Sequence, residues 1–322
     1  MKEPTNELVH IAGNTWVIDT RPTIPVYFLD DHTIVLLDSG YVDKTRPVLD
    51  RILAERDLRV RAVIGSHSHV DHNGNHGYLQ ARFGAEIILR DVEAAVVANY
   101  GMLAGAYGQA TRQDLERDMP FMILQADRTF SGTDPSVTVD GAVFGLMPLP
   151  GHTAGQTGIL TPDDALYVGD ALLNQDTMTR AKLPTSMDWH LDQASKLALR
   201  ETHHAWYILA HGGWYQDVRS LVDEDLADRS RRLLEILGWI GEKPVWTMEG
   251  LQRLLWERLG VHTKKFIRQR IFARNVTCAM GCLVEDGWLT PYFEAGVVCY
   301  RARTGAAAGL SVYGPNPERG RV

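Results

Sequence analysis

Residues 8–37 contain short runs of β-branched and apolar residues separated by turn residues. Gly13-Asn14 and Asp30-Asp31 interrupt these runs, a pattern typical of short strands joined by tight turns. The runs predict four strands, near residues 8–11, 15–18, 26–29 and 33–37. A helix is predicted at 44–55, where the apolar positions share one face, and the apolar run 60–64 predicts a buried strand.

Helical and strand patterns alternate through the middle of the chain. They predict helices near 75–83, 91–98 and 188–203, and strands near 86–89, 137–140, 143–147, 158–160, 165–168 and 205–209. Strands that alternate with helices after an initial meander indicate a mixed α/β domain. Residues 99–130 break the rhythm, with glycines among large apolar residues and a polar helix predicted at 111–119. Such an insertion is either a lid or pocket wall, or a surface excursion that never contacts substrate.

The last hundred residues have a different pattern. They predict helices near 221–240, 248–259, 264–272 and 276–285, followed by a hairpin of 287–292 and 296–301. A chain of 322 residues is longer than a single compact core usually needs. We therefore predict a main domain at 1–220, a small and mainly helical domain at 221–302, and a loose tail at 303–322.

Composition narrows the class of protein. With 45% hydrophobic and 23% charged residues, the chain is typical of a soluble globular protein. The net charge of −7 gives it no basic signature for nucleic acid, although residues 221–322 carry 15 Lys and Arg against 12 Asp and Glu. No apolar stretch is long enough to span a bilayer. The three cysteines all lie from Cys278 onward and no signal pattern opens the chain, which predicts a reducing, cytoplasmic location.

Candidate chemistry is concentrated in the stretch Ser-His-Ser-His-Val-Asp-His-Asn-Gly, residues 66–74. His67 and His69 are two apart in an extended segment, so their imidazoles point to the same side just beyond the strand 60–64. Asp71 and His72 follow where the chain turns, and aim at a neighbouring point. Imidazole and carboxylate together suit a divalent transition metal, zinc first and iron or manganese next. The alternative is a polar loop whose histidines cap the next helix.

Three further polar residues follow predicted strands: His152, Asp170 and His211. Each has a glycine beside it, which lets the backbone approach a ligand closely. Taken singly, such residues are more often structural. Together with the first motif they supply enough ligands for two metals. The natural partition gives one metal His67, His69 and His152, gives the other Asp71, His72 and His211, and leaves Asp170 as a bridge.

These motifs resemble those of the metallo-β-lactamase-fold hydrolases. His67-x-His69-x-Asp71-His72 matches the central motif of that family, and the later Gly-His, Gly-Asp and His motifs follow in the same order and approximate spacing. The resemblance covers roughly residues 8–215. It implies an α/β fold, an αββα sandwich of two mixed β-sheets with helices outside, and metals at one edge between the sheets. Asp170, where β-lactamases proper commonly carry Cys or Ser, is similar to the glyoxalase II and general hydrolase branch.

The two-metal site predicts a hydrolase. Two divalent ions lower the pKa of a shared water to about 7, which supplies a hydroxide for attack on a carbonyl. The expected substrates are thioesters, esters, lactones or amides, with Asp71 as the catalytic residue that orients the hydroxide. Two alternatives remain: a mononuclear iron oxidoreductase resembling persulfide dioxygenases, and a phosphodiesterase or nuclease that holds nucleic acid through the C-terminal domain.

Substrate and partner residues are less distinct in the sequence. Asn174, Arg180 and Lys182 follow the bridging aspartate, and Tyr107 lies in the insertion, so these four are the candidate substrate-binding residues for a small molecule. Three helices and a hairpin after residue 220 resemble a winged-helix domain. Such a domain either packs beside the metal site and shapes the pocket or a homodimer interface, or binds nucleic acid through the basic helix 264–274. Its near-balanced charge favours the first use.

Overall fold

The computed structural model describes residues 3–303, and the strands within this range form three sheets. The first contains β1 (Leu8–Ala12), β2 (Thr15–Ile18), β3 (Ile24–Phe28), β4 (Thr33–Leu37), β5 (Arg59–Ile64), β6 (Glu86–Arg90) and β7 (Arg128–Phe130), in that order. Its first four strands are antiparallel and the pairs from β4 to β7 are parallel. The predicted tail at 303–322 lies outside the described residues except for Arg303.

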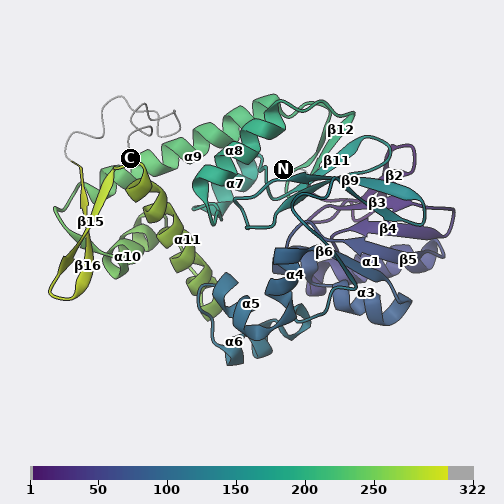
Figure 1. Ribbon diagram of the computed structural model, residues 1–322, viewed down its shortest axis with the longest axis horizontal. Coiled ribbons are helices and arrows are strands. Elements are labelled where there is room, and N and C mark those ends of the chain that lie inside the picture. Colours follow the sequence, from purple (N-terminus) through teal and green to yellow (C-terminus); the bar gives the residue numbers. More distant parts are fainter. Residues whose placement is uncertain (1–2, 304–322) are drawn as a thin grey trace.

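The second sheet has six strands and faces the first. Its order is β13 (Gly213–Tyr215), β12 (Trp206–Leu209), β11 (Ala165–Gly169), β10 (Thr157–Leu160), β9 (Ala142–Pro148) and β8 (Ser136–Val139). Only the β11–β12 pair is parallel, so this sheet is mixed as well. Both sheets lie in one lobe of the molecule, drawn in purple and teal (Figure 1).

Alternating side chains on the strands explain why the molecule has layers. In β4, Val35 and Leu37 pack between the two sheets, whereas Ile34 and Leu36 pack outward against helices. The outer cover of the first sheet is α1 (Val42–Glu55), α3 (His76–Phe83) and α4 (Asp91–Ala98). The outer cover of the second sheet is α8 (Trp189–Arg200) and the start of α9 (Arg219–Ile240). The predicted αββα sandwich of mixed sheets is confirmed.

Residues 99–122 form α5 (Tyr100–Ala106), α6 (Arg112–Asp118) and the 3-10 turn η1 (Pro120–Met122). The apolar side chains of this insertion belong to the same core as the outer face of the first sheet. Ile267, from the C-terminal part of the chain, is buried in that core as well. The insertion is therefore packed between the α/β body and the C-terminal region, rather than projecting freely into solvent.

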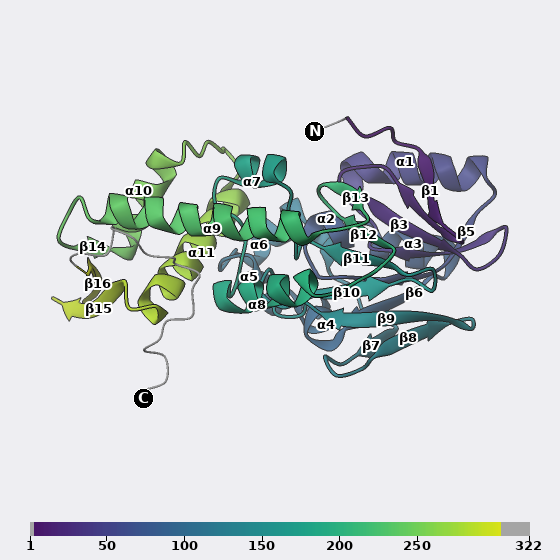
Figure 2. The ribbon, with the colours of Figure 1, turned by 90° about the horizontal axis from the view of Figure 1, so that it is seen from above.

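The C-terminal region contains the end of α9, α10 (Met248–Arg258), α11 (Phe266–Glu285) and a small sheet of β14 (Trp246–Thr247), β16 (Val297–Ala302) and β15 (Leu289–Glu294). The long helix α9 runs from the α/β lobe into this second lobe (Figure 2). The winged-helix type stays a prediction, as do the domain limits, although residue 220 falls at the start of α9.

The structure corrects the sequence prediction for α11. Two helices were expected at 264–272 and 276–285, but one helix runs from Phe266 to Glu285. The intervening Ala273-Arg274-Asn275 contains neither proline nor glycine, and Asn275 is buried with its amide donating to Thr185 rather than ending the helix. The segment 171–187, for which no element was predicted, also contains a short helix, α7 (Gln175–Ala181).

Candidate metal centre

The first motif lies directly beyond the end of β5, where the chain turns into the short helix α2 (Val70–Asn73). His67 and His69 are in the extended segment before α2, and Asp71 and His72 are in its first turn. The other three candidates lie beyond β9, β11 and β12 in turn: His152, Asp170 and His211. All four strands end at the same edge of the sandwich, so residues from distant parts of the chain meet there.

One group of donor atoms consists of His67, His69 and His152. The Nδ1 atom of His69 lies 3.1 Å from Nε2 of His67 and 2.8 Å from Nε2 of His152. Four nitrogen ligands around a zinc ion are separated by about 3.3 Å when each bond is about 2.0 Å. The spacing of the three imidazoles is therefore close to that of ligands around one metal.

The second group consists of Asp71, His72, Asp170 and His211. Nε2 of His211 lies 3.1 Å from Oδ2 of Asp71 and 3.4 Å from Oδ1 of Asp170. The same Oδ1 atom is 3.3 Å from Nε2 of His72, whereas the other oxygen, Oδ2, faces Nε2 of His152 at 3.4 Å. Asp170 thus presents one oxygen to each group, the position of a bridging carboxylate.

Two atoms of this cluster fit a cation particularly well. Nε2 of His72 and Oδ1 of Asp170 are buried and make no hydrogen bond of ordinary geometry within the described residues. Buried polar atoms are normally satisfied, and a divalent metal would satisfy both. Their assignment as ligands, with that of the other five residues, stays a prediction.

The charge distribution differs between the two groups. Burial lowers the pKa of His67, His69 and His152 below that of a free imidazole, so they remain neutral, as metal ligands must be. Burial also lowers the pKa of His72 and His211, but here the carboxylates Asp170 and Asp71 outweigh it and the net shift is upward. In the second group, the carboxylates thus attract positive charge to the place where a cation would bind.

Side chains behind the cluster hold its imidazoles in fixed orientations. Oδ2 of Asp38 lies 2.7 Å from Nδ1 of His72, which leaves Nε2 facing the cluster. The carbonyl of Thr185 lies 3.0 Å from Nδ1 of His152 in the same way. Partners of this kind fix the tautomer and the ring of a ligating histidine.

Glu93, in the first turn of α4, joins the loop that carries His67 and His69 to the loop that carries His152. Its Oε2 accepts from the backbone N–H and hydroxyl of Ser68, and its Oε1 accepts from Thr153 and the N–H of Gly155. The sequence gives no signal for this role, because an acidic residue in a first helical turn is common on surfaces. Asp38 was not among the sequence candidates either, although it directly follows β4 as the candidates follow their strands.

The glycines beside His152 and Asp170 let the backbone pack closely against other protein atoms, rather than against a bound ligand. A Cβ on Gly151 would lie 2.2 Å from the backbone nitrogen of Asp192 in α8. A Cβ on Gly169, which has φ +55°, would lie 2.9 Å from Oγ of Ser66. The glycines therefore bring His152 and Asp170 close to the first motif, by allowing tight packing behind them.

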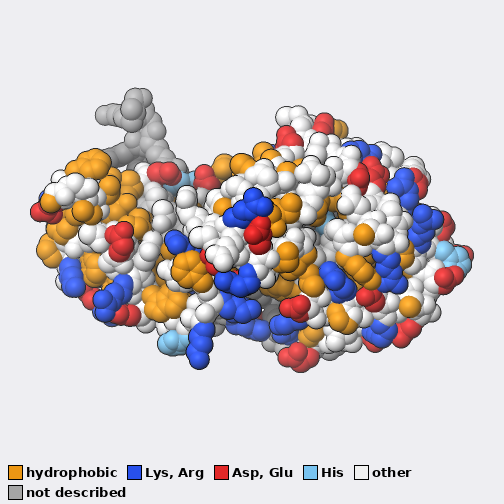
Figure 3. Space-filling view, turned by 90° about the horizontal axis from the view of Figure 1, so that it is seen from below, with side chains coloured by type: hydrophobic (Ala, Val, Ile, Leu, Met, Phe, Trp, Pro, Cys, Tyr) orange, Lys and Arg blue, Asp and Glu red, His pale blue; other side chains and the backbone are white. Residues whose placement is uncertain are grey.

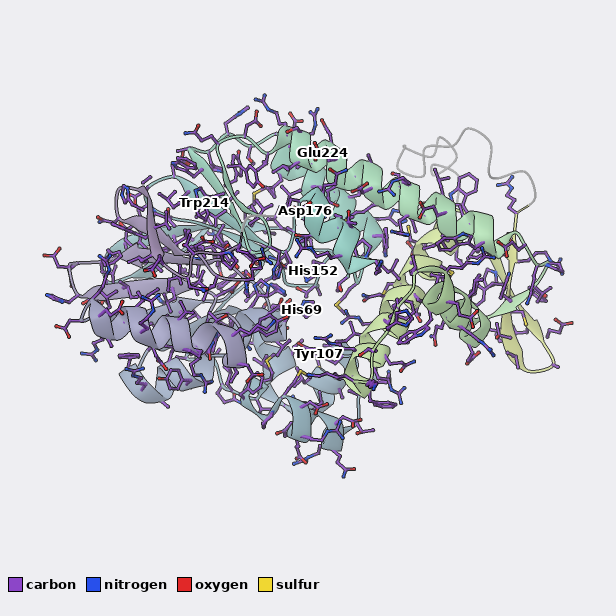
Figure 4. The ribbon with its side chains drawn as sticks, turned by 180° about the vertical axis from the view of Figure 1, so that it is seen from behind. His69, Tyr107, His152, Asp176, Trp214 and Glu224 are labelled. Carbon is purple, nitrogen blue, oxygen red and sulfur yellow. The ribbon has the colours of Figure 1, made fainter. Side chains whose placement is uncertain are left out.

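A cavity of about 520 Å³ opens above the cluster. His69, Asp71, His152 and Asp170 lie at its floor, and its walls come from the insertion and from α11. Seen from behind, His152, His69 and Tyr107 lie along the edge of the α/β lobe that faces α11 (Figure 4). The insertion is thus a pocket wall, which decides between the two uses considered from sequence.

Of the four candidate substrate-binding residues, all within the described chain, only Tyr107 lines this cavity. Its hydroxyl accepts from the N–H of Val70 at the start of α2. Asn174 caps α7 by accepting from Thr177, and Arg180 lines a separate pocket on the far side of His211. Lys182 lies in another pocket beside α9. The opposite wall comes from α11, in the C-terminal region expected to pack beside the site, but its lining residues were not identified from the sequence.

Comparisons with known proteins identify the family of the chain. Residues 12–224 match the family model described as the metallo-beta-lactamase superfamily. The chain is 26% identical over 179 residues to the 2,4-dinitroanisole O-demethylase subunit alpha of a Nocardioides species, covering 54% of this chain and 49% of that protein. It is 27% identical over 144 residues to hydroxyacylglutathione hydrolase GloC of Haemophilus influenzae, covering 44% of this chain and 63% of that protein.

Solved structures show that the likeness of fold extends over almost the whole chain. A beta-lactamase domain protein from Burkholderia ambifaria has a TM-score of 0.67 at 18% identity, covering 94% of this chain and 96% of that one. A metallo-beta-lactamase family protein from Thermus thermophilus has a TM-score of 0.64 at 20% identity, covering 92% and 97%. With the family model matched across most of the α/β lobe, the chain belongs to the metallo-beta-lactamase superfamily.

Proposed function

We propose that this protein is a metal-dependent hydrolase that holds two divalent metals and cleaves a carbonyl compound: a thioester, ester, lactone or amide. The observation that carries the proposal is the position of Asp170, whose two oxygens face two separate groups of donor atoms. A single-metal site would need only one of these groups. Zinc suits the nitrogen and oxygen donors best, and iron or manganese also fits them.

The residues of the chain divide the work between them. The seven donors would hold the metals, while Asp38 and Thr185 keep His72 and His152 in orientation. When bound, a pair of divalent cations lowers the pKa of a coordinated water to about 7 and polarises a carbonyl oxygen. Asp71 lies on the cavity floor, where its carboxylate can accept a hydrogen bond from water and hold a proton.

The name of one relative supports acyl chemistry, and the names together do not fix the substrate. One relative is named a hydroxyacylglutathione hydrolase and another an O-demethylase subunit, so relatives of this chain differ in what they act on. A one-iron oxygenase resembling persulfide dioxygenases keeps the same motif residues, so metal content and oxygen uptake distinguish it from the proposed hydrolase. Arg268 and Arg274 of α11 line the cavity above the cluster, which supports a small-molecule substrate over nucleic acid.

Metal analysis and a thioester assay test the proposal together. Protein purified without chelators should contain close to two equivalents of divalent metal by mass spectrometry, and should hydrolyse a thioester panel only with metal present. His67→Ala should lose metal and nearly all activity, whereas His203→Ala, at an exposed position near the end of α8, should lose neither. A single iron with substrate-dependent oxygen uptake would contradict the proposal.

A further inference from the structure

The N-terminal half of α11 forms one wall of the cavity above the cluster. Ile267, Arg268, Ile271 and Arg274 line the cavity from this helix, and Lys265 lines it from the residue before. Residues three or four apart in a helix share a face, so this face of α11 is turned toward the metal centre. This face carries Arg268 and Arg274, with Lys265 just before the helix. The opposite wall contributes Tyr107, Met119 and Phe121, together with the ion pair of Arg117 and Asp118.

Cationic side chains gather over the hollow between the two lobes when the molecule is viewed from below (Figure 3). Arg117, across the cavity, is already paired with Asp114 and Asp118. Arg268 and Arg274 differ, because no carboxylate of the described residues lies within ion-pair distance of either. Some exposed arginines elsewhere, such as Arg253 with Glu257, have such a partner, and others among the described residues, such as Arg56, do not. Arg268 and Arg274 are therefore distinguished by their position on the cavity wall.

Arg274 is held in place by neutral groups alone. Its guanidinium donates to the carbonyl of Ala106 and to Oδ1 of Asn275. Burial lowers the pKa of Arg274, the shift expected when a cation is partly removed from water without a counter-ion nearby. A planar guanidinium fixed in this way is preorganised for an anion, since few of its rotamers remain to be lost on binding.

We propose that the substrate carries an anionic group, a carboxylate or phosphate, which Arg268 and Arg274 bind while its carbonyl lies over the His and Asp cluster. This inference rests on the proposed hydrolase function and adds the class of substrate. The middle of such a molecule would lie against Tyr107, Met119 and Phe121. A cavity of about 520 Å³ has the size of a small-molecule site. The cations face this cavity, which favours a compact anion over a nucleic-acid backbone.

The first experiment uses three thioesters of N-acetylcysteamine that differ only at the end of the acyl chain: pentanoyl, glutaryl and 4-phosphonobutanoyl. Metal-loaded protein should show a higher kcat/KM for an anionic thioester than for the neutral one. The better of the two anions identifies the headgroup. In Arg268→Gln and in Arg274→Gln, the kcat/KM for an anionic thioester divided by that for the neutral one should fall about tenfold to a hundredfold. This is the change expected when one charge-assisted hydrogen bond is lost.

Two control variants distinguish the effect of a positive charge in the cavity from that of a positive charge elsewhere on the protein. Arg268→Lys should keep most of the ratio because the positive charge remains, although the bidentate fork is lost. Arg253→Gln removes an exposed arginine on α10, outside the cavity, and should leave the ratio as in the wild type. A wild-type ratio near one, or a ratio that survives both Arg268→Gln and Arg274→Gln, would overturn the anion site.

The second experiment measures binding without turnover. Calorimetry on metal-loaded protein compares the thioether S-(4-carboxybutyl)-N-acetylcysteamine with its uncharged S-pentyl counterpart. The carboxylate should tighten binding in the wild type and not in Arg268→Gln. If no thioester is hydrolysed but this difference is found, the hydrolase proposal fails and the anion site stands. Equal binding of the two thioethers overturns the anion site. Salt-dependent binding of RNA or DNA that Arg268→Gln abolishes would also overturn it, in favour of nucleic acid.

Discussion

Asp38 is a buried carboxylate that accepts from four donors at once. The backbone N–H and hydroxyl of Ser66, the hydroxyl of Tyr167 and Nδ1 of His72 all lie 2.6–2.7 Å from its oxygens. Three of these donors belong to the first motif and one to the second sheet, so a single side chain fixes the motif relative to both sheets. Asp38 would therefore contribute to metal binding at the proposed site through His72.

Replacing Asp38 tests this indirect role. Asp38→Asn should weaken binding at the second donor group by about tenfold to a hundredfold, because the amide no longer fixes the tautomer of His72. Chelator competition with zinc measures the affinity. Asp31→Asn, at an exposed turn, is the matched control and should bind zinc as the wild type does. Equal affinities in the two variants would exclude a role for Asp38.

His76 makes stability depend on pH. Burial lowers its pKa from 6.5 to about 4. Because the unfolded chain takes up this proton at higher pH than the folded one, the stabilisation is present above pH 6.5 and is lost as the pH falls toward 4. Over that window the loss amounts to about 3 kcal/mol. Metal-free wild type should therefore lose unfolding free energy more steeply than His76→Gln in urea titrations from pH 7 to 4.5, and parallel slopes would contradict this.

At the scale of elements, the insertion and α11 meet at a contact that requires glycine. Gly108, just after α5, has φ +71°, and a Cβ there would lie 2.4 Å from the carbonyl oxygen of Arg270. Two residues earlier, the carbonyl of Ala106 accepts from Arg274. The two walls of the cavity are thus tied directly to each other, in addition to their shared apolar core.

Two alanine substitutions separate backbone strain from steric overlap. Gly84 has a similar φ of +65° but open space around it, so Gly84→Ala should cost only about 1–2 kcal/mol of unfolding free energy. Gly108→Ala carries the same strain and adds overlap with α11, and should cost about 1–3 kcal/mol more. Urea denaturation measures both. Equal losses would show that the contact with Arg270 is easily relieved.

At the scale of the whole molecule, α9 joins the lobes through a buried ionic network. Asp225 of α9 accepts from Nε of Arg229 and from the backbone N–H of Leu173, three residues beyond Asp170. Asp192 of α8 lies 3.0 Å from Nη1 of Arg229 and 2.8 Å from Nζ of Lys196. Further along, α9 contributes Leu233, Ile236 and Ile240 to the core of the C-terminal region.

Removing one charge from this network should be costly. Asp225→Asn should lower the free energy of unfolding by about 3–5 kcal/mol, since Arg229 and Lys196 then share fewer carboxylates in a site that excludes water. Asp223→Asn, two residues earlier, breaks only an exposed pair with Arg200 and should cost about 1 kcal/mol or less. Chemical denaturation compares the two, and similar losses would mean that the network is not a unit.

What the sequence could predict depended on the range of the interactions. Most strands, most helices and the residues of the candidate cluster follow from local periodicity and from motifs just beyond strand ends, as with His67 and Asp170. The short strands β7, β13 and β14 were not predicted. The joining of two predicted helices into α11 and the helix at 175–181 were missed because weak local signals were overruled by packing. Arg274 could not be recognised as a cavity residue, because its neighbours Ala106 and Tyr107 are far away in the chain. No helix among residues 3–303 has the length and apolar character needed to cross a membrane.

The inward face of α11 has a consequence for protein engineering. The groups assigned to chemistry all come before residue 212, whereas this face lies on a separate stretch of ten residues, 265–274. A combinatorial library restricted to positions 265, 268 and 271 would therefore vary substrate selectivity and leave the candidate metal ligands unchanged. Position 274 is best kept constant, because its side chain also fastens the helix to the rest of the fold.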